Sequence, residues 1–475
     1  MMKAIVKKCA IFVTLVAIIS NIYIFTYPSL HPQSCSWNCA SSKRDYIPID
    51  SLNGVERWLY YAKRYINDVK QQILPSETAE EKGGPSDIHL LALGDPQIKG
   101  NWKHTPYITR LDTFGNDYYL GHIYSMMKKR LHPTHVAVMG DLFSSQWIGD
   151  SEFFNRTVRY THRLFKRNTT WLEAIRDENH DEDNQYKVDW VNYADDLQVR
   201  RARVPMDFQF GYEDVYSWDP ENEDSLFINI TGNHDIGYSG DATFQHMARF
   251  YELFGKDNYW IEYDNDTDHP WRIVVLNSLL LEGPALQPEF LNITWEFLYQ
   301  LFERRFAGST VLLTHVPFYK RAGLCADGPE FRYYPADFER EPYKKNLLRS
   351  QNHLSEETTK RVLNLIFDNG KPGIILTGHD HVGCETIYNK DNKSGQWKAS
   401  KVVESPEHFI KEITVKSMMG EFNGNAGLVT GRFDSKKLRW EWTFTLCPFS
   451  IQHVWWFTKV ATIISGFLLS LLVLL

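Results

Sequence analysis

The sequence predicts an α/β fold in which short strands, buried on both faces, alternate with helices. Six short apolar runs are each followed by turn or polar residues, a pattern typical of strands covered on both sides; they lie at 88–93, 136–139, 226–230, 272–276, 311–313 and 374–376. Helical patterns fall between these runs, at 118–131, 243–254, 289–306 and 355–368. Such alternation predicts helices layered on sheets.

The ends of the body carry clearer local signals. In the helix expected at 355–368, Ser355 is an N-cap, Glu356 and Glu357 lie in the first turn, and Gly370 follows the end. The segment 413–446 changes to alternating apolar and polar residues. This pattern predicts antiparallel strands that complete a sheet or sandwich.

Length and composition set broad limits. The chain has 475 residues, 43% of them hydrophobic, and a formal net charge of −7. It is therefore long enough for a large domain with insertions. A negative chain without a basic stripe is not expected to bind nucleic acid.

An apolar run at 9–27 follows Lys3, Lys7 and Lys8. It is about the 20 residues needed to cross a bilayer. The positive-inside rule places residues 1–8 in the cytosol and the following chain in a lumen. A cleaved signal peptide is the alternative. We favour an uncleaved anchor because the run is long and no small-x-small cleavage site follows it.

A second apolar run covers 454–475 and contains Lys459 near its start, where the side chain can reach the interface. Trp455 and Trp456 resemble an interfacial aromatic belt at that depth. A GPI-attachment signal is the alternative, but we find no triplet of small residues followed by a polar spacer. The expected topology has two transmembrane helices and two cytosolic tails.

Glycosylation sequons and cysteines fit a luminal body. Candidate glycosylation sites are Asn155, Asn168, Asn265, Asn292 and Asn392, whereas a sixth sequon, at Asn229, lies in a strand-like run and is expected to be buried. The luminal cysteines are Cys35, Cys39, Cys325, Cys384 and Cys447. Five cysteines allow at most two bridges, and their connectivity stays open.

The luminal part is expected to contain a stalk at 28–86 and a catalytic body at 87–447. The stalk includes an amphipathic helix candidate at 55–73 and a polar linker at 75–85. The body has an acidic, aromatic insertion at about 150–225, which we interpret as a solvated loop; a lid or a partner surface is the alternative.

Polar side chains suited to metal binding follow the predicted strands. They lie in Asp95-Pro96-Gln97, Gly140-Asp141, Gly232-Asn233-His234-Asp235, His315 and Gly378-His379-Asp380-His381. Ligands gather beyond the carboxyl ends of strands in open α/β sheets. Two cations can neutralise a developing anion and generate hydroxide near neutral pH, and they require a shared carboxylate, other oxygen ligands and imidazoles. The pattern therefore indicates a phosphoester hydrolase.

In this order, the segments resemble the calcineurin-like metallophosphoesterase superfamily, whose pattern is D-x-H, G-D, G-N-H-[DE], a lone His and G-H-x-H. The resemblance runs from about 88 to 385 and implies a sandwich of two sheets flanked by helices. It also implies residue roles: a first metal on Asp95 and His381, a bridging Asp141, a second metal on Asn233, His315 and His379, and a proton donor, His234, positioned by Asp235.

Gln97 departs from that pattern because it stands where the superfamily has histidine. A glutamine carbonyl can bind Mn²⁺, Mg²⁺ or Ca²⁺ but suits softer metals less well than imidazole does. The side chain could instead hydrogen-bond a water at the site. We therefore expect two divalent ions, with Mn²⁺ favoured and the first ion the more exchangeable.

The opening run 93–97, the closing run 378–385 and the two anchors resemble the endoplasmic-reticulum (ER) branch that remodels GPI anchors. That resemblance implies removal of an ethanolamine-phosphate side branch from a mannose of the GPI glycan, in support of ER exit. It implies an ER membrane location with a luminal catalytic domain, GPI lipid or GPI-anchored proteins as substrates, and ER cargo receptors as candidate partners.

Two alternative functions remain open. The first is a luminal phosphodiesterase that acts on a nucleotide or a phospholipid. The second is a catalytically silent cargo-export protein, in which Gln97 marks a damaged site. Which mannose would be trimmed does not follow from the sequence.

Overall fold

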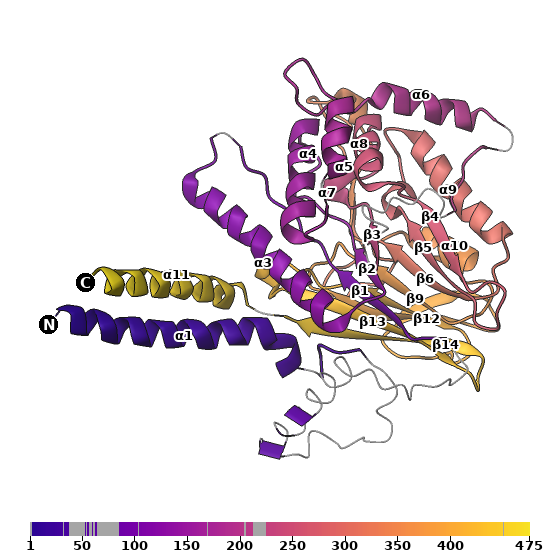
Figure 1. The fold of residues 1–475 in the computed structure, drawn as a ribbon. Coiled ribbons are helices and arrows are strands. Elements are labelled where there is room, and N and C mark those ends of the chain that lie inside the picture. The colour runs from indigo at the N-terminus through magenta and orange to yellow at the C-terminus, as the bar shows by residue number, and fades with distance from the viewer. Residues whose placement is uncertain are drawn as a thin grey trace.

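Two β-sheets stacked face to face form the body of the computed structural model (Figure 1). The first sheet has the order β14-β13-β1-β2-β3, with β1 (Ile88–Leu93), β2 (His135–Val138), β3 (Leu226–Asn229), β13 (Asn425–Asp434) and β14 (Arg439–Pro448). The second has the order β11-β10-β12-β9-β6-β5-β4, with β4 (Tyr259–Tyr263), β5 (Trp271–Leu276), β6 (Ser309–Thr314), β9 (Gly373–Thr377), β10 (Cys384–Lys390), β11 (Trp397–Ser400) and β12 (Phe409–Thr414). A separate ribbon pairs β7 (Phe331–Tyr333) with β8 (Leu348–Gln351).

The structure describes residues 2–31, 33–37, 53, 55–56, 59, 62–63, 85–102, 104–168, 170–203, 206–211, 225–449 and 451–475. The predicted stalk, its helix at 55–73 and part of the insertion at 150–225 therefore lie largely or partly outside the described residues.

Parallel strands form the centre of each sheet. In the first sheet β1, β2 and β3 run parallel, and in the second β5, β6, β9 and β12 do so. All six predicted strands are confirmed to within about two residues, and the segment predicted as antiparallel contains part of β12 followed by the β13–β14 hairpin. The carboxyl ends of β1, β2, β3, β6 and β9 carry the predicted site segments.

Both sheets are buried on both faces, as the short apolar runs predict. Leu90 and Ala92 of β1 belong to a core between the two sheets, with Val275 and Leu313 from the second sheet. Leu91 belongs to a second core formed with the helices. Because successive side chains of a strand point to opposite faces, an unbroken apolar run serves both cores at once.

Helices cover the outer faces of the sandwich (Figure 1). They are α3 (Tyr107–Leu131), α4 (Asp150–Arg159) followed by the π-helix η3 (Tyr160–Leu164), α5 (Thr170–Glu178), α6 (Trp190–Arg201), α7 (Asn233–Ile236), α8 (Phe244–Phe254), α9 (Pro288–Glu303) and α10 (Glu356–Ile366), with short 3₁₀ turns η5 (Ser278–Leu280), η6 (Pro342–Lys344) and η7 (Gly420–Phe422). Three of the four predicted helices are confirmed, with end shifts of up to three residues.

Two sequence expectations differ from the structure. The helix expected at 118–131 begins at Tyr107. The sequence does not predict this early start, because the N-cap residue, Pro106, provides no side-chain cap and Gly115 interrupts the helical pattern of the sequence. The described part of the 150–225 insertion is mainly helical rather than a solvated loop. Its helix α4 is held to α8 by the buried pair Asp150–Arg249, with 3.6 Å between Oδ1 and a guanidinium nitrogen, and by the contact of Phe153 with Phe254.

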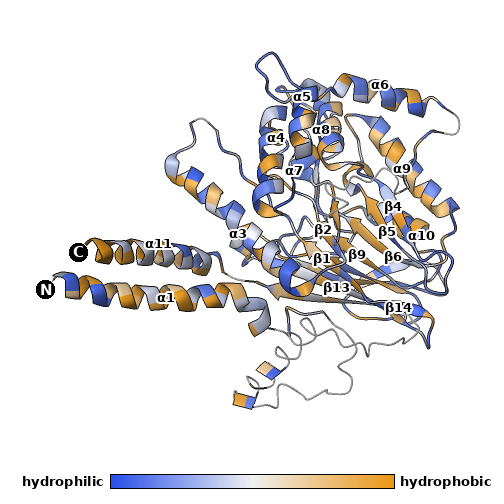
Figure 2. Cartoon of the chain, viewed as in Figure 1, coloured by the Kyte–Doolittle hydropathy of each residue, from blue (hydrophilic) through white to orange (hydrophobic). Residues whose placement is uncertain are grey.

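Helices α1 (Met2–Leu30) and α11 (Gln452–Leu474) lie side by side and run in opposite directions. Both are long and apolar enough to cross a membrane, and Figure 2 marks many residues of both helices as hydrophobic. Thr14 Oγ1 lies 2.7 Å from Ser465 Oγ, and Asn21 Nδ2 donates to Thr462 Oγ1 over 2.9 Å. Hydrogen bonds of this kind join helices within a bilayer.

Two disulfides answer the question of connectivity that the sequence left open. Cys35 pairs with Cys447 and Cys325 with Cys384, whereas Cys9 is free and Cys39 lies outside the described residues. Disulfides persist in oxidising compartments. Together with the terminal apolar helices they indicate a membrane-bound protein whose body faces a lumen.

The Cys35–Cys447 bridge ties the segment after α1 to the end of β14, just before α11. We expect Cys447→Ser to lower the free energy of unfolding by about 2–5 kcal/mol, because the bridge restricts the unfolded chain. Thermal unfolding of the detergent-solubilised chain would measure the loss. Cys9→Ser, which removes a free thiol, is the matched control, and equal unfolding temperatures for the two variants would contradict a stabilising bridge.

Candidate metal centre

The loops after five central strands meet at one end of the sandwich and bring the predicted site residues into one connected cluster. Four of these residues have left-handed backbone conformations, with φ values of 35° at Asp95, 41° at Gln97, 48° at Asp141 and 74° at His379. Non-glycine residues adopt such conformations at a cost and often do so at functional sites. The turns at the strand ends therefore hold these side chains in place.

The Asn233 side-chain oxygen is the centre of one donor group. Its Oδ1 lies 3.0 Å from His315 Nε2 and 2.9 Å from His379 Nδ1. The other ring nitrogens face backbone carbonyls: His315 Nδ1 lies 2.7 Å from the oxygen of Met139, and His379 Nε2 lies 3.1 Å from that of Gln351. A carbonyl only accepts, so these outer nitrogens carry the protons.

The inner nitrogens consequently present lone pairs. Burial lowers the pKa of His315, and it lowers the pKa of His379 to about 3, so both imidazoles are neutral near pH 7. A neutral imidazole has one N–H, which the carbonyl contacts already use. Two nitrogen lone pairs and an amide oxygen therefore face each other without a proton between them.

Two buried carboxylates complete the cluster. Asp141 Oδ1 lies 3.4 Å from His315 Nε2, and one ligand atom from each of Asp95, Asp141 and His315 lies within 4.8 Å of the others. Burial and the Asp141 carboxylate raise the pKa of Asp95. Burial opposes ionisation of Asp141 as well, whereas the His234 backbone amide, which donates to Asp141 Oδ1 over 2.8 Å, favours it.

This donor set fits a divalent cation. Asp95 Oδ1 is buried and has no hydrogen-bond partner in the part of the chain that the structure describes, and the lone pairs around Asn233 Oδ1 repel one another unless a positive charge lies between them. Neutral imidazoles, carboxylates and an amide oxygen are ligands of Mn²⁺, Zn²⁺ and Fe²⁺ in proteins. Asp141, Asn233, His315 and His379 could hold one cation.

Gln97 presents its amide NH₂ group to the cluster, whereas Asn233 presents its amide oxygen. Its Nε2 donates to Asp141 Oδ2 over 3.0 Å and lies 3.1 Å from His381 Nε2. The amide NH₂ thus links the two residues that, with Asp95, could hold a second cation. Half a turn about χ3 would direct the carbonyl oxygen there instead. The second position is therefore open to a cation only at the expense of two hydrogen bonds.

His234 and Asp235 follow Asn233 on α7 but have different environments. The His234 side chain is 37% exposed, and its Nε2 lies 3.7 Å from Asp141 Oδ2, so it can reach a molecule bound from solvent. Asp235 is fully buried and accepts hydrogen bonds from the backbone amides of Gly232, Leu142 and Phe143. Asp235 therefore ties the loop after β2 to the loop after β3 and acts on His234 through the backbone.

Sequence reasoning missed the groups that orient the ligands. The carbonyls of Met139 and Gln351 select the tautomers of the two central histidines, and the ring of Phe422 lies 5.1 Å from that of His381. Met139 could have been found, because it is the last residue before the Gly140-Asp141 motif. Gln351 and Phe422 lie on distant segments and carry no local signal.

The sequons differ in exposure in the way that the sequence predicts. The side chains of Asn155, Asn168, Asn265, Asn292 and Asn392 are exposed, so all five are accessible to modification. Asn229 is buried and accepts a hydrogen bond from Tyr160. Modification of the exposed sites stays a prediction.

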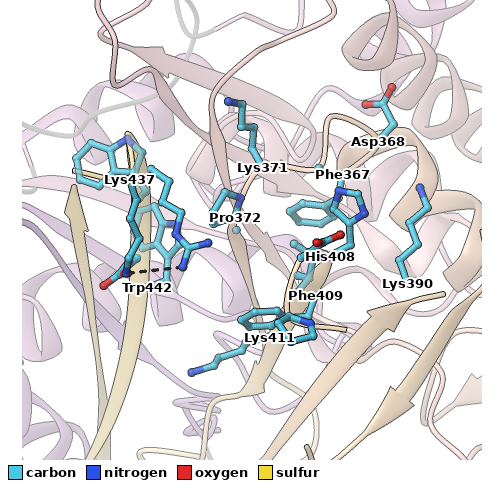
Figure 3. A pocket seen from close by; sticks show the side chains of 18 of the residues that line it. Phe367, Asp368, Lys371, Pro372, Lys390, His408, Phe409, Lys411, Lys437 and Trp442 are labelled. Carbon is cyan, nitrogen blue, oxygen red and sulfur yellow. Dashed lines mark hydrogen bonds and ion pairs between the residues drawn. The ribbon is translucent and has the colours of Figure 1, made fainter. Parts of the chain in front are cut away.

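A cavity of about 460 Å³ lies at the end of the sandwich opposite the metal centre, beside the amino ends of β9, β12 and β14. Figure 3 shows Lys371, Lys390, Lys411 and His408 around it. Among the described residues, the group able to hold a metal lies in the cluster at the other end. We therefore assign the chemistry to the end that carries Asp141.

Comparisons with known proteins identify relatives of the chain. The chain is 60% identical to Protein TED1 of Saccharomyces cerevisiae over 98% of both chains, and 21% identical to Metallophosphoesterase 1 of Xenopus laevis over 66% of this chain and 76% of the relative. A 5'-nucleotidase precursor of Thermus thermophilus gives a TM-score of 0.29 at 12% identity, over 80% of this chain and 58% of the other. No family model matches the chain.

His246 contacts the short helix α7, which bears Asn233 and His234 of the metal centre. It lies on α8, and its Nδ1 is 3.1 Å from the carbonyl oxygen of Ile236, at the end of the short helix that bears Asn233 and His234. Burial lowers the pKa of His246 to about 3. The folded chain therefore keeps this imidazole neutral, whereas in the unfolded chain it takes up a proton below about pH 6.5.

We expect His246 to make folding sensitive to acid. Its contribution to stability is fully present above about pH 6.5 and is lost as the pH falls toward about 3, by about 2 kcal/mol at pH 5. Urea unfolding of the metal-stripped chain at pH 7 and pH 5 would measure it. His246→Gln should reduce the loss between these pH values, whereas His162→Gln, an exposed position on η3, should not. Equal acid losses in wild type and His246→Gln would rule out this cause.

Proposed function

We propose a substrate for this chain on the premise that it belongs to the metallophosphoesterase family of yeast Protein TED1. The chain is a metallophosphoesterase, and the family relationship extends over nearly its whole length, terminal helices included. We infer that it hydrolyses a phosphodiester carried on a membrane glycolipid, namely the ethanolamine-phosphate side branch on a mannose of the GPI glycan.

The position of the metal centre relative to α11 carries this proposal. β14 pairs antiparallel with β13, which pairs antiparallel with β1, so β14 and β1 point the same way. β1 ends at the catalytic cluster, and β14 ends at Pro448, just before the helix that can span the membrane. The chemistry therefore lies at the membrane end of the sandwich, which suits a substrate attached to a lipid.

The proposed reaction breaks the bond between phosphorus and the mannose oxygen. Divalent cations, when bound, neutralise phosphoryl charge and make water a better nucleophile. Asp95, Asp141, Asn233, His315, His379 and His381 would hold these cations, with Mn²⁺ the favoured ion. His234 Nε2 would give a proton to the departing mannose oxygen while water attacks phosphorus, and Asp235 would keep His234 in place through the α7 backbone.

Negative charge near the centre suits the ammonium group of ethanolamine. Asp380 lies between the two metal-site histidines and is buried. Burial, with the carboxylates of Asp380 and Glu330, raises the pKa of Asp327, so these three acids lie close enough to influence one another. A substrate with a primary ammonium would relieve their repulsion.

The location and partners follow from the same resemblance. We propose that the protein resides in the ER membrane with its body in the lumen and that GPI lipid or GPI-anchored proteins are its substrates. Cargo receptors for ER exit are candidate partners. The two disulfides and five exposed sequons support a luminal body.

Mass spectrometry of GPI glycans tests the proposal. In cells whose only copy carries Asn233→Ala, we expect one mannose to retain an extra ethanolamine-phosphate, because the amide oxygen between His315 and His379 is lost. Purified Asn233→Ala should also lose bound metal and fall by more than about 100-fold in turnover, since even indirect ligand contacts are worth 10–100-fold. Asn192→Ala, exposed on α6, is the matched control.

Other results would redirect the proposal. Identical glycans in wild-type and Asn233→Ala cells, together with turnover of a nucleotide or phospholipid by the purified chain, would favour that substrate class. Identical glycans without any turnover, while loss of the whole chain still impairs export, would favour a binding role in cargo export.

Gln97 tests the second cation. We expect wild type to retain one divalent ion after dialysis and to take up a second only at high Mn²⁺, because the Gln97 amide competes by bonding Asp141 and His381. Gln97→His should tighten the second ion by about 10-fold or more, since imidazole is a metal ligand and not a competing donor. Elemental analysis after graded dialysis would measure the metal content. Equal metal content in both proteins at every Mn²⁺ concentration would refute the competition.

A further inference from the structure

The first turns of α3 stand away from the body and carry a large apolar surface. Tyr107 and Ile108 are 78% and 80% exposed, and the remaining exposed apolar side chains here are Trp102, Leu111, Phe114 and Tyr118. At 100° per residue, positions 107, 111, 114 and 118 lie within about 60° of one another on one side of the helix, Ile108 lies beside them, and Thr109 lies opposite. An exposed apolar patch of this size marks a contact surface.

The flank of α3 that carries Ile108 packs on the two spanning helices farther along. A Cβ atom at Gly115 would lie 1.8 Å from Cζ2 of Trp456, the ring of Tyr119 lies 6.0 Å from that of Trp455, and His122 Nε2 lies 3.0 Å from the carbonyl oxygen of Ile24. These positions continue Ile108 and Leu111 at intervals of three or four residues. The exposed surface is thus an extension of the interface that α3 already makes with α11 and α1.

These contacts place α3 at the bilayer surface. Trp455 and Trp456 lie at the start of α11, and Ile24 lies near the end of α1, so α3 crosses the luminal ends of both helices. Tryptophan is enriched at this depth of a membrane. Figures 1 and 2 show the amino end of α3 on the same side of the body as α1 and α11. Beside the spanning pair, the free turns of α3 would meet lipid.

The rim of the metal centre lies next to this region. Phe422 of η7 packs on His381, and a Cβ atom at Gly420, the first residue of η7, would lie 2.2 Å from Oε1 of Gln452 in α11. Gln452 Nε2 in turn donates to Asn116 Oδ1 of α3 over 3.4 Å. A short series of contacts therefore joins the metal-site residue His381 to the crossing of α3 and α11.

We propose that the amino-terminal half of α3, together with Trp102, is immersed in the luminal leaflet as a third membrane contact beside the opening of the metal centre. Its occupant is phospholipid, because the surface is continuous with the faces that pack on the two spanning helices. Arg110, which donates to the carbonyls of Trp102 and Thr105, lies at the polar edge, where head groups are. The proposal rests on the two membrane helices and not on the substrate proposed above.

Photocrosslinking in the full chain tests this contact. Benzoylphenylalanine would replace Ile108 or Leu111 one at a time, in protein reconstituted into nanodiscs of phosphatidylcholine and phosphatidylethanolamine that contain an alkyne-tagged phosphatidylcholine. Control positions are Thr109 on the polar side of α3, Tyr343 on the exposed turn η6, and Ile463, 71% exposed on α11, as a lipid-facing standard. All five positions are exposed, so the probe should not disturb packing.

We expect lipid adducts at Ile108 and Leu111 to approach those at Ile463 and to exceed those at Thr109 and Tyr343 by at least about fivefold, as for an interfacial amphipathic helix. Yields at Ile108 and Leu111 no higher than at Tyr343 would overturn the proposal. Adducts to a second copy or to another protein in place of lipid would also overturn it. No turnover is needed, so failure of the proposed substrate would leave this result unchanged.

A charge variant gives an independent readout. Ile108→Glu with Leu111→Glu should reduce turnover of a phosphodiester embedded in the nanodisc by about tenfold, because immersed carboxylates are expelled from lipid, and should leave turnover of soluble bis(p-nitrophenyl) phosphate unchanged. Thr109→Glu, on the polar side, is the matched control. An equal loss on both substrates would show damage to the body and would overturn the membrane role.

Discussion

The structure depends on a group of buried electron-pair donors that face each other without protons. Asn233 Oδ1 lies about 3 Å from an imidazole nitrogen of His315 and from one of His379, and backbone carbonyls hold the protons of both rings on the far side. Burial keeps both rings neutral. Without a positive charge at its centre this arrangement is unfavourable, because the facing lone pairs repel one another. The same donors that could bind a cation therefore also require one.

The rest of the body holds these donors in place. Parallel strands from two sheets end at the same edge, and left-handed residues such as Asp95 and Asp141 turn their side chains inward immediately after the strands. Asp235 uses its carboxylate to join two of the turns through three backbone amides. A residue in a catalytic motif, such as Asp235, can therefore stabilise the backbone. Main-chain carbonyls that belong to no motif, in turn, determine which ring nitrogens can bind a metal.

The orientation of the sandwich links this chemistry to a membrane. Because β14 points in the same direction as β1, the chain leaves the body for α11 at the catalytic end. The Cys35–Cys447 bridge fixes the segment after α1 to the same place. This placement supports the proposed lipid-linked phosphoester substrate. The same geometry brings the amino-terminal half of α3 to the bilayer surface.

The α/β class, the six central strands, the apolar terminal helices and the order of the metal-binding segments could be predicted from the sequence, because each depends on local periodicity or on side chains next to a strand end. The pairing of cysteines 412 residues apart, the Gln97 contacts with Asp141 and His381, and the tautomers set by Met139 and Gln351 could not be predicted, because they depend on residues distant in the chain becoming neighbours. The early start of α3 escaped prediction because Pro106, at its N-cap position, provides no side-chain cap and Gly115 interrupts the helical pattern.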